Sequence, residues 1–337
     1  MNQVSDGTDN SDMVQSPHVV ILGAGASIAS CKRNQEANGR KLPSMDNFVS
    51  LLGLEEILDP EINFEISYSQ MYDNNPNDER LGAIQERVRD YFSSLILPDE
   101  PTIYDYLVLS LRPKDLIATF NWDPFLYQAF SRSKRFSLQL PHLSFLHGCV
   151  SLGFSAERGL GPLGYSYIDD AGEEIPFHEI PLLYPVANKD YSKNIAIAQE
   201  WERLKSWLSD AKVVTVFGYS APESDEAAMR LLIGAWGDNK TKNIEQIELI
   251  NTDDEKVVLE KWKQLVFCDH YDYHNDYFRS RIARSPRRSI EHLIHQILPN
   301  TVEEARESDN PAPEDVEDLD ELYRWFQPLL SSEKQDE

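Results

Sequence analysis

The stretch that decides the fold reads His18-Val19-Val20-Ile21-Leu22-Gly23-Ala24-Gly25-Ala26-Ser27. An apolar, β-type run leads directly into a Gly-Ala-Gly-Ala-Ser turn, which predicts a buried strand followed by a helix. Such a turn lets backbone N–H groups approach a phosphate at the start of a helix, where the helix dipole favours negative charge. The stretch therefore predicts a nucleotide site, with a glycine-rich turn that holds no ligand as the alternative.

Short apolar strands and amphipathic helices alternate along the chain. The clearest strand signals lie at residues 19–22, 116–120, 213–217 and 247–250. A helical stripe with i, i+4, i+7 and i+11 spacing is formed by Ile197, Trp201, Leu204 and Leu208. A second helix is expected over 227–233, with Ser224 or Asp225 as its cap. The alternation predicts the α/β fold class, a Rossmann-like doubly wound parallel sheet whose ligands bind at the carboxyl ends of strands.

The chain divides into three predicted parts. These are a disordered acidic N-terminus (1–16), a nucleotide-binding domain (17–299) with a helical insert at about 32–115 and a loop-rich insert at about 151–181, and an acidic linker with a short helix (300–337). The apolar face of that helix consists of Leu319, Leu322, Phe326 and Leu329. We expect the helix either to dock on the domain or to bind a partner.

Composition narrows the function classes. The 337 residues include 57 acids and 32 bases, and the net charge of −25 disfavours direct binding to nucleic acid or to an anionic membrane. No run of about 18 apolar residues is present and the polar N-terminus lacks signal-peptide features, so neither a transmembrane helix nor secretion is expected. Cys31, Cys149 and Cys268 lie far apart, which fits a reducing cytoplasm and excludes a four-cysteine zinc site.

The turn departs from the pattern of dinucleotide-dependent dehydrogenases, which is Gly-x-Gly-x-x-Gly with an acid about 20 residues later. Ile28 stands at the third glycine position, and Asp46 follows a segment, 41–45, that does not read as a strand. Two sequence features typical of a hydride-transferring dehydrogenase, the third glycine and the acid after a second strand, are therefore missing.

Polar residues follow two strand-like segments. Asn121 and Asp123 come directly after the predicted strand 116–120. His147 comes after a second strand-like segment, 144–146, and precedes Gly148. Asp123 before a proline is also a typical helix start, whereas Asn121 offers both a donor and an acceptor to a sugar or amide. His147 suits a general base near neutral pH, with an ordinary turn residue as the alternative.

Two further strands end in residues that suit a ligand. Gly218-Tyr219-Ser220 follows 213–217, and Asn251 follows the strand that ends at Ile250. The glycine turn lets backbone approach a ligand, and Asn251 offers an amide, with a simple Asn turn as the alternative.

Taken in order, these motifs resemble the sirtuin family over residues 18–270. The matching segments are Gly23-Ala24-Gly25-Ala26-Ser27, Thr119-Phe120-Asn121-Trp122-Asp123, His147-Gly148, Gly218-Tyr219-Ser220 and Ile250-Asn251. Leu183-Tyr184-Pro185 with Lys189 is similar to a Pro-and-Lys segment of divergent members.

The resemblance implies a sirtuin-like fold that binds NAD and breaks its nicotinamide–ribose bond. The turn at 23–27 would hold the pyrophosphate, and Asp123 would contact the nicotinamide amide. Asn121 would orient the ribose and an attacking water. His147 would hydrogen-bond the ribose hydroxyls and act as a base.

On the adenosine side, the resemblance implies contacts from Ser220, in the turn with Gly218 and Tyr219, and from Asn251. Deacylating sirtuins carry a four-cysteine zinc module after the His-Gly segment, but residues 151–181 contain no cysteine. No zinc and no cofactor beyond NAD, as substrate, is therefore expected. This departure and the long segment between the first two motifs resemble bacterial sirtuin-like effectors of antiphage defence, which hydrolyse NAD to nicotinamide and ADP-ribose.

The predicted function is therefore a cytoplasmic NAD glycohydrolase that acts in defence by depleting NAD. Because such an activity needs control, we expect a homo-oligomer or a partner subunit such as a DNA-translocating ATPase or a nucleic-acid sensor. An NAD-dependent protein deacylase and a catalytically quiet NAD or ADP-ribose binding subunit are the alternatives.

Two polar clusters stay outside this site. The basic cluster consists of Arg279, Arg281, Arg284, Arg287 and Arg288. We interpret it as a solvated face paired with the acidic tail, with a contact to a partner, a protomer or phosphate as the alternative. Cys268, His270 and His274 have spacing that a metal could use but lack an evident fourth ligand, and His292 and His295 read as surface or packing residues.

Overall fold

The computed structural model describes residues 14–31, 36–37, 40–44, 47–186, 189–222, 225–237, 245–266, 270–297 and 309–333. Most of the predicted N-terminal segment, together with Ser224 and Cys268, lies outside these residues.

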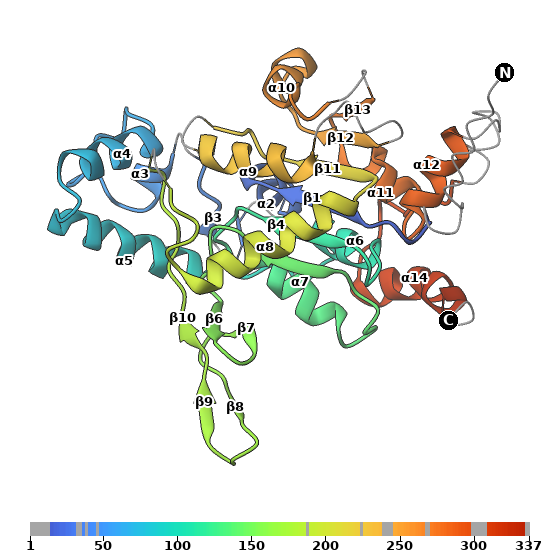
Figure 1. The fold of residues 1–337 in the computed structure, drawn as a ribbon, viewed down its shortest axis with the longest axis horizontal. Helices are drawn as coiled ribbons and strands as arrows, with labels where there is room; N and C mark the ends of the chain where they lie inside the picture. The colour runs from blue at the N-terminus through green and yellow to red at the C-terminus, as the bar shows by residue number, and fades with distance from the viewer. Residues whose placement is uncertain are drawn as a thin grey trace, which may run out of the picture.

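A six-stranded parallel sheet forms the centre of the domain (Figure 1). Its strands, in spatial order, are β13 (Tyr271–His274), β12 (Gln246–Ile250), β11 (Val213–Phe217), β1 (His18–Leu22), β4 (Leu116–Thr119) and β5 (His142–Phe145). All neighbouring pairs run parallel. Numbered along the chain and read from β5, the order is 3-2-1-4-5-6, which is the order of a doubly wound dinucleotide-binding sheet. The predicted fold class is confirmed.

Helices cover both faces of this sheet. They are α2 (Ala24–Ser30), α3 (Phe48–Leu51), α4 (Phe64–Asn74), α5 (Glu79–Ser93), α6 (Ile103–Leu109), α7 (Phe125–Ser133), α8 (Ile195–Asp210), α9 (Glu226–Trp236), α10 (Glu255–Trp262), η2 (Tyr277–Arg279), α11 (Arg281–Arg284), α12 (Ser289–Ile297) and α14 (Leu319–Glu333). Val20 and Leu22 of β1 pack into one core with α2 to α7 and α14, whereas Val19 and Ile21 pack into another with α8, α9 and α10. Burial on both faces explains the unbroken apolar run of β1.

Most of the predicted elements are present, with small shifts at their ends. The predicted stripe of α8 is buried as expected. Asp225 stands at the N-cap position of α9, but its side chain makes no capping bond. The strand predicted over 116–120 ends at Thr119. Strand β13 was not predicted, because its residues, Tyr-Asp-Tyr-His, are all half-buried and form no apolar run.

The two inserts differ in structure. The first holds α3 to α6, preceded by the short pair β2 (Glu36–Ala37) and β3 (Arg40–Lys41). The second, predicted as loop-rich, forms β6 (Leu152–Ser155), β7 (Gly159–Pro162), β8 (Ser166–Ile168), β9 (Glu174–Pro176) and β10 (His178–Glu179). The β8–β9 hairpin projects away from the domain (Figure 1). Glycines at positive φ, such as Gly164 (83°) and Gly172 (85°), allow these reversals, which corrects the prediction of loops.

The C-terminal helix docks on the domain, as one of the two expectations had it. Leu322, Phe326 and Leu330 of α14 are buried in the same core as α6 and α7. The preceding segment also follows the surface of the domain, because Ala312 and Val316 are buried in that core and the Tyr106 hydroxyl donates to the Pro313 carbonyl at 2.7 Å.

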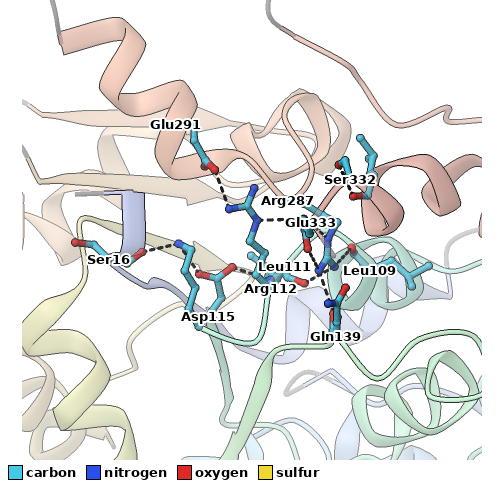
Figure 2. Close-up of polar contacts among 12 residues, drawn as sticks. Ser16, Leu109, Leu111, Arg112, Asp115, Gln139, Arg287, Glu291, Ser332 and Glu333 are labelled. Atoms are coloured by element: carbon cyan, nitrogen blue, oxygen red, sulfur yellow. Dashed lines mark hydrogen bonds and ion pairs between the residues drawn. The ribbon is translucent and has the colours of Figure 1, made fainter. Parts of the chain in front are cut away.

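The basic cluster is divided: Arg279, Arg284 and Arg288 are exposed, as predicted for a solvated face, but Arg281 and Arg287 are internal. Arg281 and Arg287 are only 4% and 2% exposed. The guanidinium of Arg287 donates to Glu333 at the end of α14, at 2.6 and 2.7 Å (Figure 2). It also donates to three backbone carbonyls, those of Leu109, Leu111 and Gln139. Arg112 shares Glu333 and pairs with Glu291 of α12 at 2.8 Å. We call Arg112, Arg287, Glu291 and Glu333 the Arg287 network. The pairing of Arg287 with the acidic tail is as predicted. The burial of Arg287 follows from the carbonyl groups that its guanidinium satisfies.

No helix among the described residues is both long and apolar enough to cross a membrane. Within the same residues, no group of three or more His, Cys, Asp or Glu side chains is arranged to hold a metal ion. His274 instead lies 3.3 Å from the buried carboxylate of Glu248.

Candidate functional site

Two glycine turns interlock where β1 and β11 end side by side. The register pairs Leu22 with Phe217, so the turns that follow them meet. A Cβ on Gly23 would lie 2.5 Å from the Cα of Tyr219, and Gly218, at φ +63°, would place a Cβ 2.3 Å from the amide of Ala26. Only glycine fits at these contacts. The two turns therefore form one rigid floor at the point where the strand order of the sheet reverses.

The amides of this floor are largely in use within the protein. Gly23 donates to the Phe217 carbonyl and Gly25 to the Gly218 carbonyl, each at 3.0 Å, and Ala26 donates back to Gly23. The glycines therefore serve close packing between the turns. The role of residues 23–27 in holding a pyrophosphate stays a prediction, and these three amides are not free to serve it.

Asn121 is held by its amide nitrogen. Nδ2 donates to the Gly23 carbonyl at 2.8 Å, to Ser27 Oγ at 2.9 Å and to the Tyr104 hydroxyl at 3.3 Å. An oxygen in that position would face a carbonyl, so these partners fix which way the amide points. The Oδ1 atom is left on the opposite side of the amide, available as a hydrogen-bond acceptor.

The partners of Asn121 form a directed chain of hydrogen bonds. Ser27 Oγ lies 2.6 Å from Asp123 Oδ2, to which it donates, and 2.7 Å from the Tyr104 hydroxyl. Because the Ser27 proton goes to Asp123, the Tyr104 hydroxyl must donate to Ser27. The chain joins four side chains from α2, α6 and the end of β4. We call Asn121, Tyr104, Ser27 and Asp123 the Asn121 chain.

Asp123 is the titratable member of this chain. It is 5% exposed, and its Oδ1 accepts from the Phe125 amide, the first of α7, at 3.1 Å. Pro124, and not Asp123 as predicted, holds the N-cap position of α7. Burial raises the pKa of Asp123 to about 6, although the bonds from Ser27 and Phe125 oppose the rise. The carboxyl can therefore be protonated or ionised near neutral pH.

His147 lies across the cavity from the glycine floor, after β5. Its Nε2 is 3.3 Å from the Tyr191 hydroxyl and 4.0 Å from Asp225 Oδ1, and its ring packs edge-on against Phe120 at 4.8 Å. Burial, reinforced by the Lys189 ammonium, lowers the pKa of His147 to about 3. The ring is thus neutral at physiological pH. It is a hydrogen-bond acceptor and a weaker base than the sequence suggested.

A buried ion pair that the sequence analysis did not assign to the site stands next to His147. The Lys189 ammonium donates to Asp225 Oδ1, and the Tyr219 hydroxyl donates to Asp225 Oδ2 at 2.9 Å. The side chains of Lys189 and Asp225 are 5% and 6% exposed. Lys189 entered the analysis only through a family segment and Asp225 only as a helix cap. Tyr104 and Tyr191 had no signal, because neither belongs to a motif.

The glycine floor, His147 and the Lys189–Asp225 pair line one cavity of 160 Å³, whereas Tyr104 and Tyr191 lie behind residues of its wall. Of the predicted site residues, it is lined by Gly23, Ala24, Ser27, Asn121, Asp123, His147, Gly218, Tyr219 and Ser220. Leu183 and Pro185, from the predicted family segment, also line it. Ala26 is buried within α2, and the ring of Tyr219 stacks on Phe120 at 4.1 Å, so neither side chain is free to hold a ligand by itself.

A second cavity of 550 Å³ lies on the other side of the glycine floor, lined by Gly25, Gly218 and Asn251. The two cavities share Ile28, Leu42 and Gly218. Ser220 and Asn251, both predicted for the adenosine side, therefore lie in different cavities: Ser220 is with His147, and Asn251 is beyond the turn. The pair of cavities gives the floor the two sides that an elongated dinucleotide would need.

No protein-family model matches the chain, and no curated protein matches it. Among solved structures, the chain is similar to two mutants of a Sir2 homologue in complexes with ADP-ribose. They share 14% and 15% identity, cover 95% of this chain and 96% of theirs, and have TM-scores of 0.38 and 0.37. It is also similar to Sir2 bound to an acetylated peptide, at 12% identity over 83% of this chain and 91% of that chain, with a TM-score of 0.35. The fold assignment rests on the sheet order described above.

Proposed function

We propose that the protein is an NAD glycohydrolase, which releases nicotinamide and ADP-ribose. The observation that carries the proposal is the orientation of Asn121: its Nδ2 is consumed by Gly23, Ser27 and Tyr104, which leaves Oδ1 to accept from a water or a ribose hydroxyl in the cavity. His147, neutral at physiological pH, supplies a second acceptor on the wall of the same cavity. Two fixed acceptors beside a glycine floor suit a reaction that needs a positioned water.

Cleavage of the nicotinamide–ribose bond depends more on the positioning of NAD and water than on acid catalysis. When the nicotinamide–ribose bond breaks, its electron pair goes to the ring nitrogen and neutralises the positive charge of the pyridinium. The leaving group thus needs no proton. The water oxygen then bonds to the ribose C1′, and the proton of the water passes to His147 or to solvent. Holding the reactants in place can supply roughly 7–11 kcal/mol of such a barrier.

The test is release of nicotinamide from NAD by the purified full-length protein. The wild-type chain should produce nicotinamide and ADP-ribose in equal amounts, and Asn121→Ala should abolish both. Asn74→Ala, on the exposed end of α4, removes the same side chain from a site without function and should leave the rate unchanged.

Other outcomes would replace the proposal. Release that requires an acetyl-lysine peptide would favour an NAD-dependent deacylase. Binding of NAD without release would favour a binding subunit.

We further propose that the activity serves bacterial antiphage defence by depleting NAD in the cytoplasm, within a homo-oligomer or with a partner such as a DNA-translocating ATPase or a nucleic-acid sensor. Support comes from the sequence resemblance, and the net charge of −25 favours sensing through a partner over direct nucleic-acid binding. Cells that express the chain with its neighbouring genes should lose NAD during infection, and cells with Asn121→Ala should not. Equal NAD levels in the two would contradict this role.

A further inference from the structure

The cavity contains a buried positive charge, paired with a carboxylate. The Lys189 ammonium and the Asp225 carboxylate both line it, with almost no exposure to solvent. Two buried ions cost several kcal/mol each in lost hydration, and the pair persists because each compensates the other. Neither residue is needed for the hydrogen bonds of the Asn121 chain.

Asp225 is held in place independently of Lys189. The Tyr219 hydroxyl donates to its Oδ2 at 2.9 Å, and the Tyr219 ring is itself fixed by stacking on Phe120. The carboxylate would therefore stay in position if the ammonium left. It would then be an unpaired buried anion on the cavity wall, which is a strong binding site for another cation.

Lys189 has a route out of the cavity. It lines not only the cavity but also a groove of 560 Å³ between α8 and α9, to which Asp190 and Glu202 contribute carboxylates. The cavity itself, at 160 Å³, is smaller than the roughly 300–1,000 Å³ of typical ligand pockets. Rotation of the lysine side chain into the groove would enlarge the cavity and bring the ammonium toward Asp190. Glu202, in the same groove, is paired with Lys205 at 2.6 Å, and Arg230 also lines the groove.

We propose that Lys189 is an internal occupant of a cation subsite formed by Asp225, and that the subsite accepts an aromatic cation of the pyridinium class, which displaces the ammonium into the α8–α9 groove. The inference rests on the proposed function in one respect, because the nicotinamide ring of NAD is such a cation before the bond breaks and a neutral molecule afterwards. The exchange would give the site a preference for the charged substrate over the neutral product, since only a cation can replace the charge of Lys189 beside Asp225.

The first experiment measures binding of N-methylnicotinamide that is methylated on the ring nitrogen, and so is a permanent cation, and of neutral nicotinamide at pH 8, where His147 stays neutral. Lys189→Met removes the charge but keeps an unbranched stem. It should bind the cation at least about tenfold more tightly than wild type, equivalent to about 1.4 kcal/mol, with little change for nicotinamide. Lys189→Arg, the matched control, keeps the charge and should bind the cation no more tightly than wild type.

The second experiment uses the wild-type chain and so does not depend on how the variant folds. Acetylation of Lys189 by an amine-reactive ester, read by mass spectrometry, should be slow in the free protein and should accelerate when N-methylnicotinamide is added, but not with nicotinamide. Cation binding that leaves Lys189 protected, or no cation binding to wild type and Lys189→Met alike, would overturn the inference. Because neither readout uses NAD hydrolysis, loss of the proposed activity with intact cation exchange would refute the glycohydrolase alone.

Discussion

The parallel strands of the central sheet begin at one side, which we call the amino edge, and end at the other, the carboxyl edge. The two edges carry polar networks of different chemistry. At the amino edge, before β4 and β5, the Arg287 network pairs full charges of opposite sign, and Asp115 accepts from the His18 and Arg112 amides (Figure 2). At the carboxyl edge, three members of the Asn121 chain (Ser27, Asn121 and Asp123) line a cavity, and burial displaces the pKa values of Asp123 and His147 toward the neutral forms. Displaced pKa values beside a cavity are typical of a functional site, whereas compensated charges without one hold the structure together.

The largest effect expected is on stability, at the amino edge. Arg287→Met would leave Arg112 as the cation paired with Glu333 and would remove the donor from three buried carbonyls, those of Leu109, Leu111 and Gln139. The unfolding free energy should therefore fall by about 4 kcal/mol. Urea denaturation measures this. Arg230→Met, which breaks an exposed pair with Glu226, is the matched control and should change stability by less than about 1 kcal/mol. Equal losses in the two would mean that the Arg287 network is not structural.

The second effect is a pH dependence from the carboxyl edge. The pKa of Asp123 is 3.8 in the unfolded chain and about 6 in the folded protein, so the folded state binds more protons between these values. Stability from this group is therefore fully present below pH 3.8 and is lost as pH rises through 6, a change of about 3 kcal/mol. Asp123→Asn carries a neutral group of the same shape at every pH, so it should lack this fall between pH 4 and 7. An unchanged slope in the variant would contradict the buried, protonatable carboxyl.

The sequence predicted the carboxyl edge far better than the amino edge. Strands that end in Gly23, Asn121 and Gly218 could be recognised because short apolar runs stop at polar or glycine residues, and parallel strands bring their carboxyl ends together. The sequence could not show that Ser220 and Asn251 lie in different cavities. The packing of two turns separates these residues, and no local pattern marks that packing.

Long-range contacts account for the remaining failures. Tyr104 reaches Ser27 over 77 positions, and Arg287 reaches Leu109 over 178, so no local pattern marks either contact. The arginine cluster was interpreted as solvated because arginines usually are, which holds for its three exposed members. Only the fold shows the carbonyl groups that buried Arg287 satisfies. Asp225 illustrates a competing reading: its place before a helix is typical of a cap, while its side chain turns to Lys189 and Tyr219.

A smaller effect tests whether the C-terminal helix contributes to stability without contributing to the activity of the site. Glu333→Gln keeps one acceptor for Arg287 but removes the charge, which should lower the unfolding free energy by about 2 kcal/mol. NAD hydrolysis should not change, because the network lies at the edge opposite the cavity. Glu321→Gln, an exposed acid on the same helix, controls for loss of charge from α14 and should leave stability nearly unaltered. A fall in hydrolysis with Glu333→Gln would show that the two edges are coupled.

The smallest effect tests whether the Asn121 chain positions the amide. Tyr104→Phe removes one acceptor for Asn121 Nδ2 and the donor to Ser27, while the Gly23 carbonyl still holds the amide. We expect kcat for NAD hydrolysis to fall about tenfold, or about 1.4 kcal/mol in the barrier, with KM nearly unchanged, because the lost contact orients the acceptor and does not bind substrate. Tyr106→Phe, two residues along α6, loses a bond to the Pro313 carbonyl instead and should lower stability without changing kcat. If both variants changed kcat equally, α6 would act as a structural support common to both edges, and the separation between them would not hold.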